Sequence, residues 1–245
     1  MIRCVAAFLA FAAAGPAAAV ECRDLTHQGN LYTVCEVDPR AEELRLFLND
    51  DQGKLLGQFS AVDSTLRAEG TRLAFAMNAG MYHTDRSPVG HYIENGKEQK
   101  RVIPNAGPGN FGLLPNGVFC IRAGRADVIE TLAYDADRPD CAFATQSGPM
   151  LVIDGALHPR FLPDSTSRYI RNGVGTSADG TRAVFAISGN TVTFHEFGSL
   201  FRDVLKVPNA LYFDGNISRL YVPQLGRSDP GFSMGPIVGV VASGP

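Results

Sequence analysis

The chain of 245 residues lacks several features that would point to a partner or a membrane. It contains no tryptophan, no cluster of lysine and arginine, and no apolar run of the roughly 20 residues that a membrane span needs. Its formal net charge is −3, and charges of both signs are mixed along the chain. We therefore expect neither a nucleic-acid partner nor a membrane span.

The sequence also lacks linkers of the kind that separate domains. The sequence has no low-complexity segment, no internal repeat and no stretch at which it would divide into domains. Residues 20–245 are enough to form one domain with its own hydrophobic core. We predict a single domain over that range and leave the oligomeric state open.

Residues 1–19 have the pattern of a cleavable signal peptide. Arg3 precedes the uncharged apolar run 4–14, a Gly-Pro pair ends that run, and three alanines follow at 17–19. We expect cleavage near Ala19 and a secreted or periplasmic protein. An uncleaved anchor is the alternative.

Cysteine usage agrees with export. Cys4 lies in the signal segment, which leaves Cys22, Cys35, Cys120 and Cys141, an even number as expected in an oxidising compartment. We favour the pairs Cys22–Cys35 and Cys120–Cys141, because the partners are near in sequence. A zinc site is the alternative, although the sequence has no C-x-x-C pair and no paired histidine spacing.

The hydrophobic pattern is rich in short strands. Alternating or continuous apolar stretches, separated by turn residues, predict strands over 31–37, 44–48, 73–77, 91–94, 118–122, 150–153, 182–187, 211–213 and 236–241. One helix is predicted over 194–205, because Thr193 and Glu196 form a capping box ahead of apolar residues at helical spacing. The pattern indicates an α+β fold, a strand-rich mixed sheet with few helices, and an all-β sandwich is the alternative.

Polar segments adjoin four of these strands. They lie at 78–82, 146–149, 171–175 and 214–218, where a rigid scaffold often presents functional side chains. Taken singly, an Asn-x-Gly or Asp-Gly sequence after a strand is most often only a turn.

Taken together and in this order, the segments resemble the phosphodiester glycosidase family. The resemblance runs from about Leu73 to Tyr221 and is closest over RNGVGTSADG, AVFAIS, FHEFGSLFRDVL and NALYFDGNISRLY. It implies hydrolysis of a sugar, such as N-acetylglucosamine, that is joined through its anomeric carbon to a phosphodiester. The expected substrate is a sugar phosphodiester or an envelope glycan, and no cofactor or metal ion is implied.

The resemblance also implies the site residues. Asp214 and Glu196 are the carboxylates expected to stabilise or attack the sugar as it gains oxocarbenium character. Arg171 is expected to form a fork to the phosphate oxygens. The implied substrate-binding residues are Asn78, Gly173, Gln146, Ser147, Gly148, Gly215 and Ser218. The chain departs from the family pattern where Asn216 and Ile217 follow Gly215 in place of a second glycine.

Other interpretations compete with this one. Glu196 at the third position of a capped helix is also a structural residue. Ser147 suggests a serine hydrolase, but its neighbours lack the G-x-S-x-G pattern. His83, Asp85 and His91 suggest a metal-dependent phosphodiesterase, with spacing that is weak for a metal site.

A non-catalytic glycan-binding protein on the same scaffold is the alternative from a different functional class. In that case the four polar segments form a sugar pocket, and the carboxylates only accept hydrogen bonds. The tyrosines that would replace tryptophan as stacking platforms are Tyr82, Tyr92, Tyr169 and Tyr221.

Overall fold

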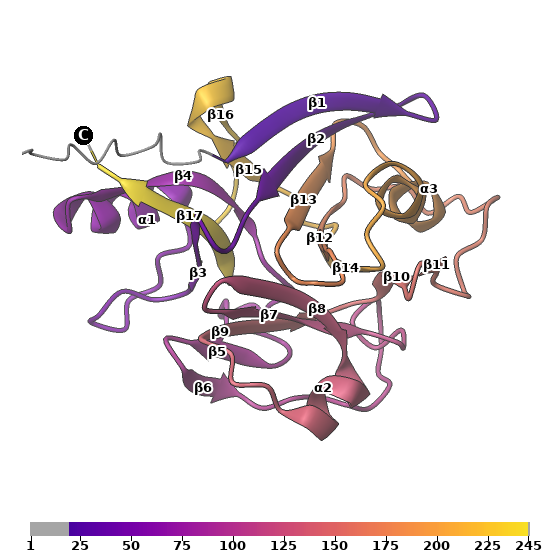
Figure 1. The fold of residues 1–245 in the computed structure, drawn as a ribbon, viewed down its shortest axis with the longest axis horizontal. Helices are drawn as coiled ribbons and strands as arrows, with labels where there is room; N and C mark the ends of the chain where they lie inside the picture. The colour runs from indigo at the N-terminus through magenta and orange to yellow at the C-terminus, as the bar shows by residue number, and fades with distance from the viewer. Residues whose placement is uncertain (1–19, 245) are drawn as a thin grey trace, which may run out of the picture.

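The computed structural model describes residues 20–244, so the predicted signal peptide at 1–19 lies outside the described residues. Within 20–244 the strands form three antiparallel sheets, and the helices are few and short (Figure 1). This confirms the predicted strand-rich α+β class. No helix in this part of the chain combines the length and apolar character that crossing a bilayer requires.

The largest sheet has seven strands in the order β1-β2-β13-β12-β14-β10-β11. Their bounds are β1 Glu21–His27, β2 Asn30–Val37, β13 Ala183–Ser188, β12 Asn172–Thr176, β14 Asn209–Asp214, β10 Met150–Ile153 and β11 Ala156–Leu157. The segment 171–175, singled out from the sequence as a polar segment beside a strand, is thus mostly the central strand β12.

The two smaller sheets have five strands each. One contains β16 Arg227–Ser228, β15 Leu220–Val222, β4 Thr71–Asn78, β17 Ile237–Ser243 and β3 Glu43–Phe47, in that order. The other contains β6 Lys97–Lys100, β5 Tyr92–Glu94, β9 Phe143–Ser147, β7 Gly117–Arg122 and β8 Arg125–Glu130. The predicted strand 73–77 lies within β4, which is an inner strand because it pairs with both β15 and β17.

The predicted helix forms with its capping box intact. It runs as α3, Phe194–Ser199, and continues into a π-helical turn, Leu200–Val204. The helix α3 lies against the large sheet (Figure 1), and its apolar side chains pack on that sheet. The sequence analysis did not predict α1, Phe59–Ala68, which covers β4, or the shorter α2, Thr131–Asp137. A 3-10 turn, Pro223–Leu225, follows β15.

Aromatic side chains join the three sheets at one core. The ring of Phe185 in β13 lies 4.9 Å from Phe75 of β4 and 5.8 Å from Phe119 of β7, measured between centroids. Phe119 also contacts Phe213 of β14 at 6.2 Å. All four are fully buried. Removing such a ring typically costs roughly 3–5 kcal/mol, so each sheet depends on the others.

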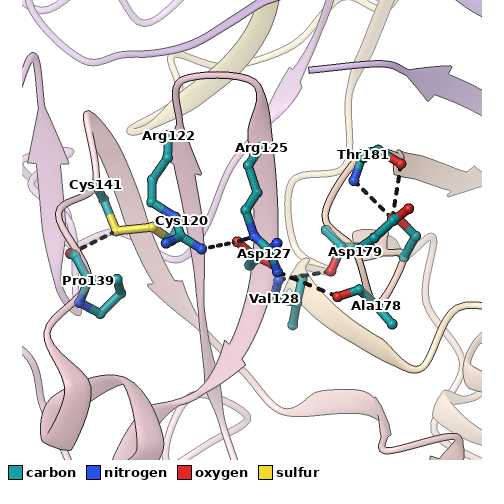
Figure 2. Close-up of polar contacts among 12 residues, drawn as sticks. Cys120, Arg122, Arg125, Asp127, Val128, Pro139, Cys141, Ala178, Asp179 and Thr181 are labelled. Carbon is teal, nitrogen blue, oxygen red and sulfur yellow. Dashed lines mark hydrogen bonds and ion pairs between the residues drawn. A yellow bond between two sulfur atoms is a disulfide. The ribbon is translucent and has the colours of Figure 1, made fainter. Parts of the chain in front are cut away.

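Both predicted disulfides are confirmed. Cys22 and Cys35 are direct partners in the β1–β2 ladder. Cys120 of β7 joins Cys141, which follows α2, as Figure 2 shows. Two disulfides are typical of proteins from an oxidising, extracytoplasmic compartment.

Figure 2 also shows how the β7–β8 hairpin is tied to the large sheet. Arg122 and Arg125 both form ion pairs with Asp127. The Arg125 guanidinium further donates to the carbonyl of Ala178, in the turn between β12 and β13. This contact is far from the strand ends described next, so it serves the fold.

The ends of four strands from all three sheets lie together. Asn78 ends β4, Ser147 ends β9, Asp214 ends β14, and Asn172 begins β12. Asn172 is paired with Asp214 in the ladder and bonds to Asn78, while the Ser147 hydroxyl donates to the carbonyl of Phe213. All four polar segments singled out from the sequence therefore meet at this junction.

Candidate active site

A cavity of about 540 Å³ opens beside this junction. Small-ligand sites typically enclose roughly 300–1,000 Å³. The end of β14 and three separate loops form its wall. The lining residues are Met81, Tyr82, Val89, Pro108, Gly109, Asn110, Phe111, Ser167, Tyr169, Tyr212, Asp214, Gly215 and Asn216.

Asp214 is the only acidic residue in the lining formed by the described part of the chain. Its Oδ1 accepts hydrogen bonds from the backbone N–H groups of Gly215 at 2.6 Å and Asn216 at 2.9 Å. One carboxyl oxygen is thus fixed by the turn, which leaves the other for a ligand. Burial raises the pKa of Asp214 above its ordinary value of 3.8, although the same N–H groups oppose the shift.

The turn after Asp214 has little free space. A β-carbon at Gly215 would lie 2.0 Å from the Tyr212 hydroxyl oxygen, so a glycine is needed there. Neither Asn216 nor Ile217 has a positive φ. The departure from the family pattern therefore places no left-handed backbone on the β-branched Ile217.

Two buried amides hold this turn in place. The side chains of Asn78 and Asn172 form a reciprocal pair, with Nδ2–Oδ1 distances of 2.9 and 3.2 Å. Asn172 Oδ1 also accepts the backbone N–H of Asp214 at 3.2 Å, and Asn78 Oδ1 accepts that of Arg219 at 3.0 Å. The predicted residue Asn78 therefore supports the site from beneath, and Asn172, which the sequence analysis passed over, is its partner.

Arg171 is fully buried, with 1% of its surface exposed. Its Nε donates to the carbonyl of Val192 at 2.9 Å, and Nη2 donates to the carbonyl of Ser167 at 3.1 Å. The ring of Phe194 lies 3.7 Å from the guanidinium carbon. The group is thus clamped by backbone and ring, and it does not line the cavity.

The third guanidinium nitrogen of Arg171 differs from Nε and Nη2 in its hydrogen bonding. Nη1 is buried and has no hydrogen-bond partner within residues 20–244. The guanidinium carbon lies 5.4 Å from each of the Tyr169 and Tyr212 rings, and both tyrosines line the cavity. Burial lowers the pKa of Arg171, but an arginine stays charged in proteins. A positive charge therefore sits one layer behind the cavity wall, and the predicted fork from Arg171 to phosphate stays a prediction.

Glu196 does not line the cavity. Its Oε2 accepts the backbone N–H of Thr193 at 2.8 Å and lies 2.9 Å from Nη2 of Arg168. Burial opposes ionisation of Glu196, but these donors outweigh it and lower the pKa. The Glu196 carboxylate therefore caps the helix α3. It lies outside the cavity in which the sugar was expected to bind.

The segment 146–149 is structural as well. The Gln146 side chain accepts the backbone N–H of both His91 and Ile103, and it donates to the carbonyl of Ile103. Ser147 is fully buried and its hydroxyl donates to a backbone carbonyl, so it is not presented as a nucleophile. Gly148 packs against Asn116, where a β-carbon would lie 2.5 Å from Asn116 Cβ. None of the three lines the cavity.

Gly173 and Ser218 also lie outside the lining. Gly173 is inside β12, which is paired with a strand on each side, so its backbone N–H is not free to cradle a phosphate. The Ser218 hydroxyl lies 3.0 Å from the carbonyl oxygens of Ile170 and Asp214 and stabilises its own turn.

The alternative metal ligands do not converge. His91 is buried and bonds through its ring to the carbonyl of Lys100 and the hydroxyl of Tyr134. Asp85 accepts from Ser87 in an exposed loop. Within residues 20–244 no three His, Cys, Asp or Glu side chains gather as metal ligands would.

Comparison with known proteins agrees with the resemblance noted from the sequence. The family model for phosphodiester glycosidases matches residues 71–239. The chain belongs to the phosphodiester glycosidase family. A relative from Escherichia coli K12, the uncharacterized protein YigE, is 34% identical over 212 residues, which cover 86% of this chain and 80% of YigE.

Solved structures share the fold. The catalytic domain of zebrafish N-acetylglucosamine-1-phosphodiester alpha-N-acetylglucosaminidase, auto-inhibited by its pro-peptide, aligns with a TM-score of 0.64 and 15% identity, over 94% of this chain and 85% of that one. A putative exported protein from Burkholderia pseudomallei aligns with a TM-score of 0.57 and 12% identity, over 86% of this chain and 74% of that one. At such identities the likeness shows the fold alone.

Replacing Glu196 with alanine tests its place in this member of the phosphodiester glycosidase family. We expect a loss of about 1 kcal/mol in the free energy of unfolding, because the capping box is broken. Sugar release should stay within about twofold, because the carboxylate is outside the cavity. Urea unfolding and a turnover assay check both, with the neighbouring His195→Ala as the control. A large loss of turnover in a stably folded Glu196→Ala variant would restore the catalytic expectation.

Proposed function

We propose that this protein hydrolyses sugar-1-phosphodiesters, with Asp214 as the catalytic carboxylate. The observation that carries the proposal is the half-buried Asp214 carboxyl group in the cavity, with one oxygen fixed by two backbone N–H groups and its pKa raised by burial. A carboxylate whose pKa moves toward neutrality is a better general base. The family match supports the class of reaction.

In the proposed step, Asp214 acts as general base. It takes a proton from a water molecule as the water oxygen bonds to the anomeric carbon. The bond between that carbon and the bridging oxygen breaks, and the electron pair leaves with the phosphomonoester. A phosphate is a good leaving group, so one carboxylate suffices where alkyl glycosides call for two. A single displacement inverts the anomeric configuration, and NMR of the released sugar reads it directly.

Arg171 supports the leaving phosphate through its charge and not through contact. The guanidinium stays one layer behind Tyr169 and Tyr212, where the low-dielectric wall preserves its field in the cavity. That field favours the negative charge that develops on the departing group.

The aromatic rings provide the surface for the sugar. Tyr82, Phe111, Tyr169 and Tyr212 all line the cavity. Aromatic faces offer large apolar area together with hydroxyl groups at their edges. Of the four tyrosines named as stacking candidates from the sequence, Tyr92 is instead fully buried, and Tyr221 packs on Phe59.

We also propose that the protein is exported and cleaved after Ala19. The apolar run and alanine triplet support cleavage, and the two disulfides support an oxidising destination such as the periplasm or the exterior.

A panel of sugar-1-phosphodiesters, including N-acetylglucosamine-1-phosphodiesters, tests the activity. We expect release of free reducing sugar together with a phosphomonoester, at equal rates. Sugar binding measured by calorimetry with no release from any member of the panel would favour the non-catalytic glycan-binding protein instead.

The pH dependence of the melting temperature should report the raised pKa of Asp214. Because burial raises its folded pKa, the unfolded chain loses the Asp214 proton first as pH rises. Ionisation then favours the unfolded chain, so the contribution of Asp214 to stability falls above its ordinary pKa of 3.8. Asp214→Asn should therefore gain melting temperature relative to wild type between pH 4 and neutrality.

The control should move the other way. Hydrogen bonds from Ser177 and Thr181 lower the pKa of Asp179 to about 2, so Asp179→Asn should melt below wild type by a constant margin above pH 4, and that margin should shrink as the pH falls from 4 toward 2. Equal pH profiles for wild type and Asp214→Asn would show that burial does not raise the Asp214 pKa.

A further inference from the structure

A second cavity, of about 630 Å³, lies where the described chain begins. Its wall includes Val20, Glu42, Glu43, Arg72, Gln224 and Val240, and none of these residues belongs to the candidate active site. The buried carboxyl group of Glu42 is the feature of this cavity that indicates a ligand.

Glu42 has one satisfied and one unsatisfied carboxyl oxygen. Oε2 accepts the backbone N–H of Asp38 at 2.8 Å, while Oε1 is buried and has no hydrogen-bond partner within residues 20–244. Only 9% of the residue is exposed. Burial raises the pKa of Glu42. An orphan oxygen on a buried carboxylate costs free energy unless a cation or donor reaches it.

The charged side chains nearby do not supply that cation. Each nearby arginine contacts another group instead. Arg40 pairs with Asp38, Arg45 pairs with Glu43, and Arg72 donates to the carbonyl of Ser243. Within residues 20–244 Glu42 itself takes part in no ion pair, since the thirteen pairs found there join other residues. The ligand of Glu42 therefore has to come from another group.

Val20 lines the same cavity as Glu42. In the β1–β2 ladder Glu21 is paired with Glu36, so the same register places Val20 beside Val37, one residue before Asp38. The Val20 carbonyl accepts the side-chain N–H of Gln224 at 2.8 Å, and only 4% of the residue is exposed. The backbone of Val20 is thus held in the wall of the cavity that contains Glu42.

We propose that this cavity is a binding site for the chain's own mature N-terminus, in which the α-ammonium of Val20 pairs with Glu42. Cleavage after Ala19 consumes one water molecule. Its hydroxyl goes to the Ala19 carbonyl carbon and its hydrogen to the Val20 nitrogen, which takes a second proton near neutral pH. The inference rests on the proposed cleavage site and is independent of the sugar phosphodiester activity.

The pair has a consequence for folding. In the uncleaved precursor the Val20 nitrogen is an uncharged amide, whereas in the mature protein it is an ammonium that can pair with Glu42. Processing would therefore stabilise the fold after export, in the compartment where the disulfides also form.

The experiment uses protein exported with its own signal segment. Intact mass should identify Val20 as the first residue. The α-amino pKa, read from the pH dependence of its acylation by mass spectrometry, should lie above the ordinary value of about 8. In Glu42→Gln it should return to that value. A first residue other than Val20, or the same α-amino pKa in both proteins, would overturn the proposal.

Thermal unfolding gives a second readout. Glu42→Gln and a variant with one glycine inserted before Val20 should each lose roughly 5 °C in melting temperature. The two changes combined should lose no more than either alone, because they break the same pair. Glu43→Gln, at the exposed neighbour, should move the melting temperature by less than about 2 °C. Additive losses would contradict the pairing.

Discussion

Replacing Asp214 with asparagine is expected to lower the rate of sugar release by about 10³-fold, within the range that removal of a general base typically gives. Asparagine has nearly the same shape, and its side-chain oxygen can still accept the N–H groups of Gly215 and Asn216. It cannot take a proton from water. The loss should therefore fall on turnover, with sugar affinity nearly unchanged.

The chain offers a matched control for that substitution. Asp154 is also followed by glycine after a strand, but it is exposed and lies outside the cavity. Asp154→Asn should leave turnover within about twofold, since surface changes away from a site rarely matter. If Asp214→Asn kept most of the wild-type turnover in a folded protein, the proposed role of Asp214 would be wrong.

Replacing Asn172 with alanine is expected to cost about 3 kcal/mol in the free energy of unfolding. The change removes both hydrogen bonds that Asn172 donates to Asn78, and it removes the acceptor of the Asp214 backbone N–H. All of these groups lie in a buried or half-buried junction, where an unsatisfied polar group costs roughly 1–3 kcal/mol. Turnover should fall as well, because the turn that holds the Asp214 carboxyl group loses its anchor.

Urea unfolding measures the first effect, and Asn209→Ala provides the comparison. The Asn209 side chain accepts a single backbone N–H, from Asp154, at the protein surface, and its loss should cost below about 1 kcal/mol. Equal losses for the two variants would show that the amide pair does not anchor the junction.

The strands were largely predictable, because alternating and continuous apolar runs are local signals. β1, β8, β9 and β12 were not predicted. Gly173 of β12 was expected to bind substrate, yet the glycines of this strand are there because neighbouring elements approach closely: a β-carbon at Gly173 would lie 2.4 Å from the Leu211 carbonyl oxygen, and one at Gly175 would lie 2.6 Å from Val207. A spacing that only the folded sheet creates cannot be seen in a sequence.

The carboxylate of the candidate site was predictable from the sequence, whereas most of the residues that line its cavity were not. Asp214 and Gly215 follow a recognisable strand, and the structure places both in the cavity. Asn110 and Phe111 come from a loop more than 100 residues away in sequence, so only tertiary structure brings them to the same wall. Arg171 was predicted to reach the phosphate, whereas the structure buries its guanidinium among aromatic rings outside the cavity lining.

The amide pair of Asn78 and Asn172 joins two different sheets, whereas most of the cavity wall comes from loops that the pair does not touch. Chemistry and recognition are therefore carried by separable parts of the molecule. Loops such as 108–111 can be exchanged or lengthened without disturbing the carboxyl group at the junction. Proteins with this fold can change the sugars that they accept while they keep the same reaction. Mutant libraries confined to those loops are therefore the natural starting point for changing the sugar specificity.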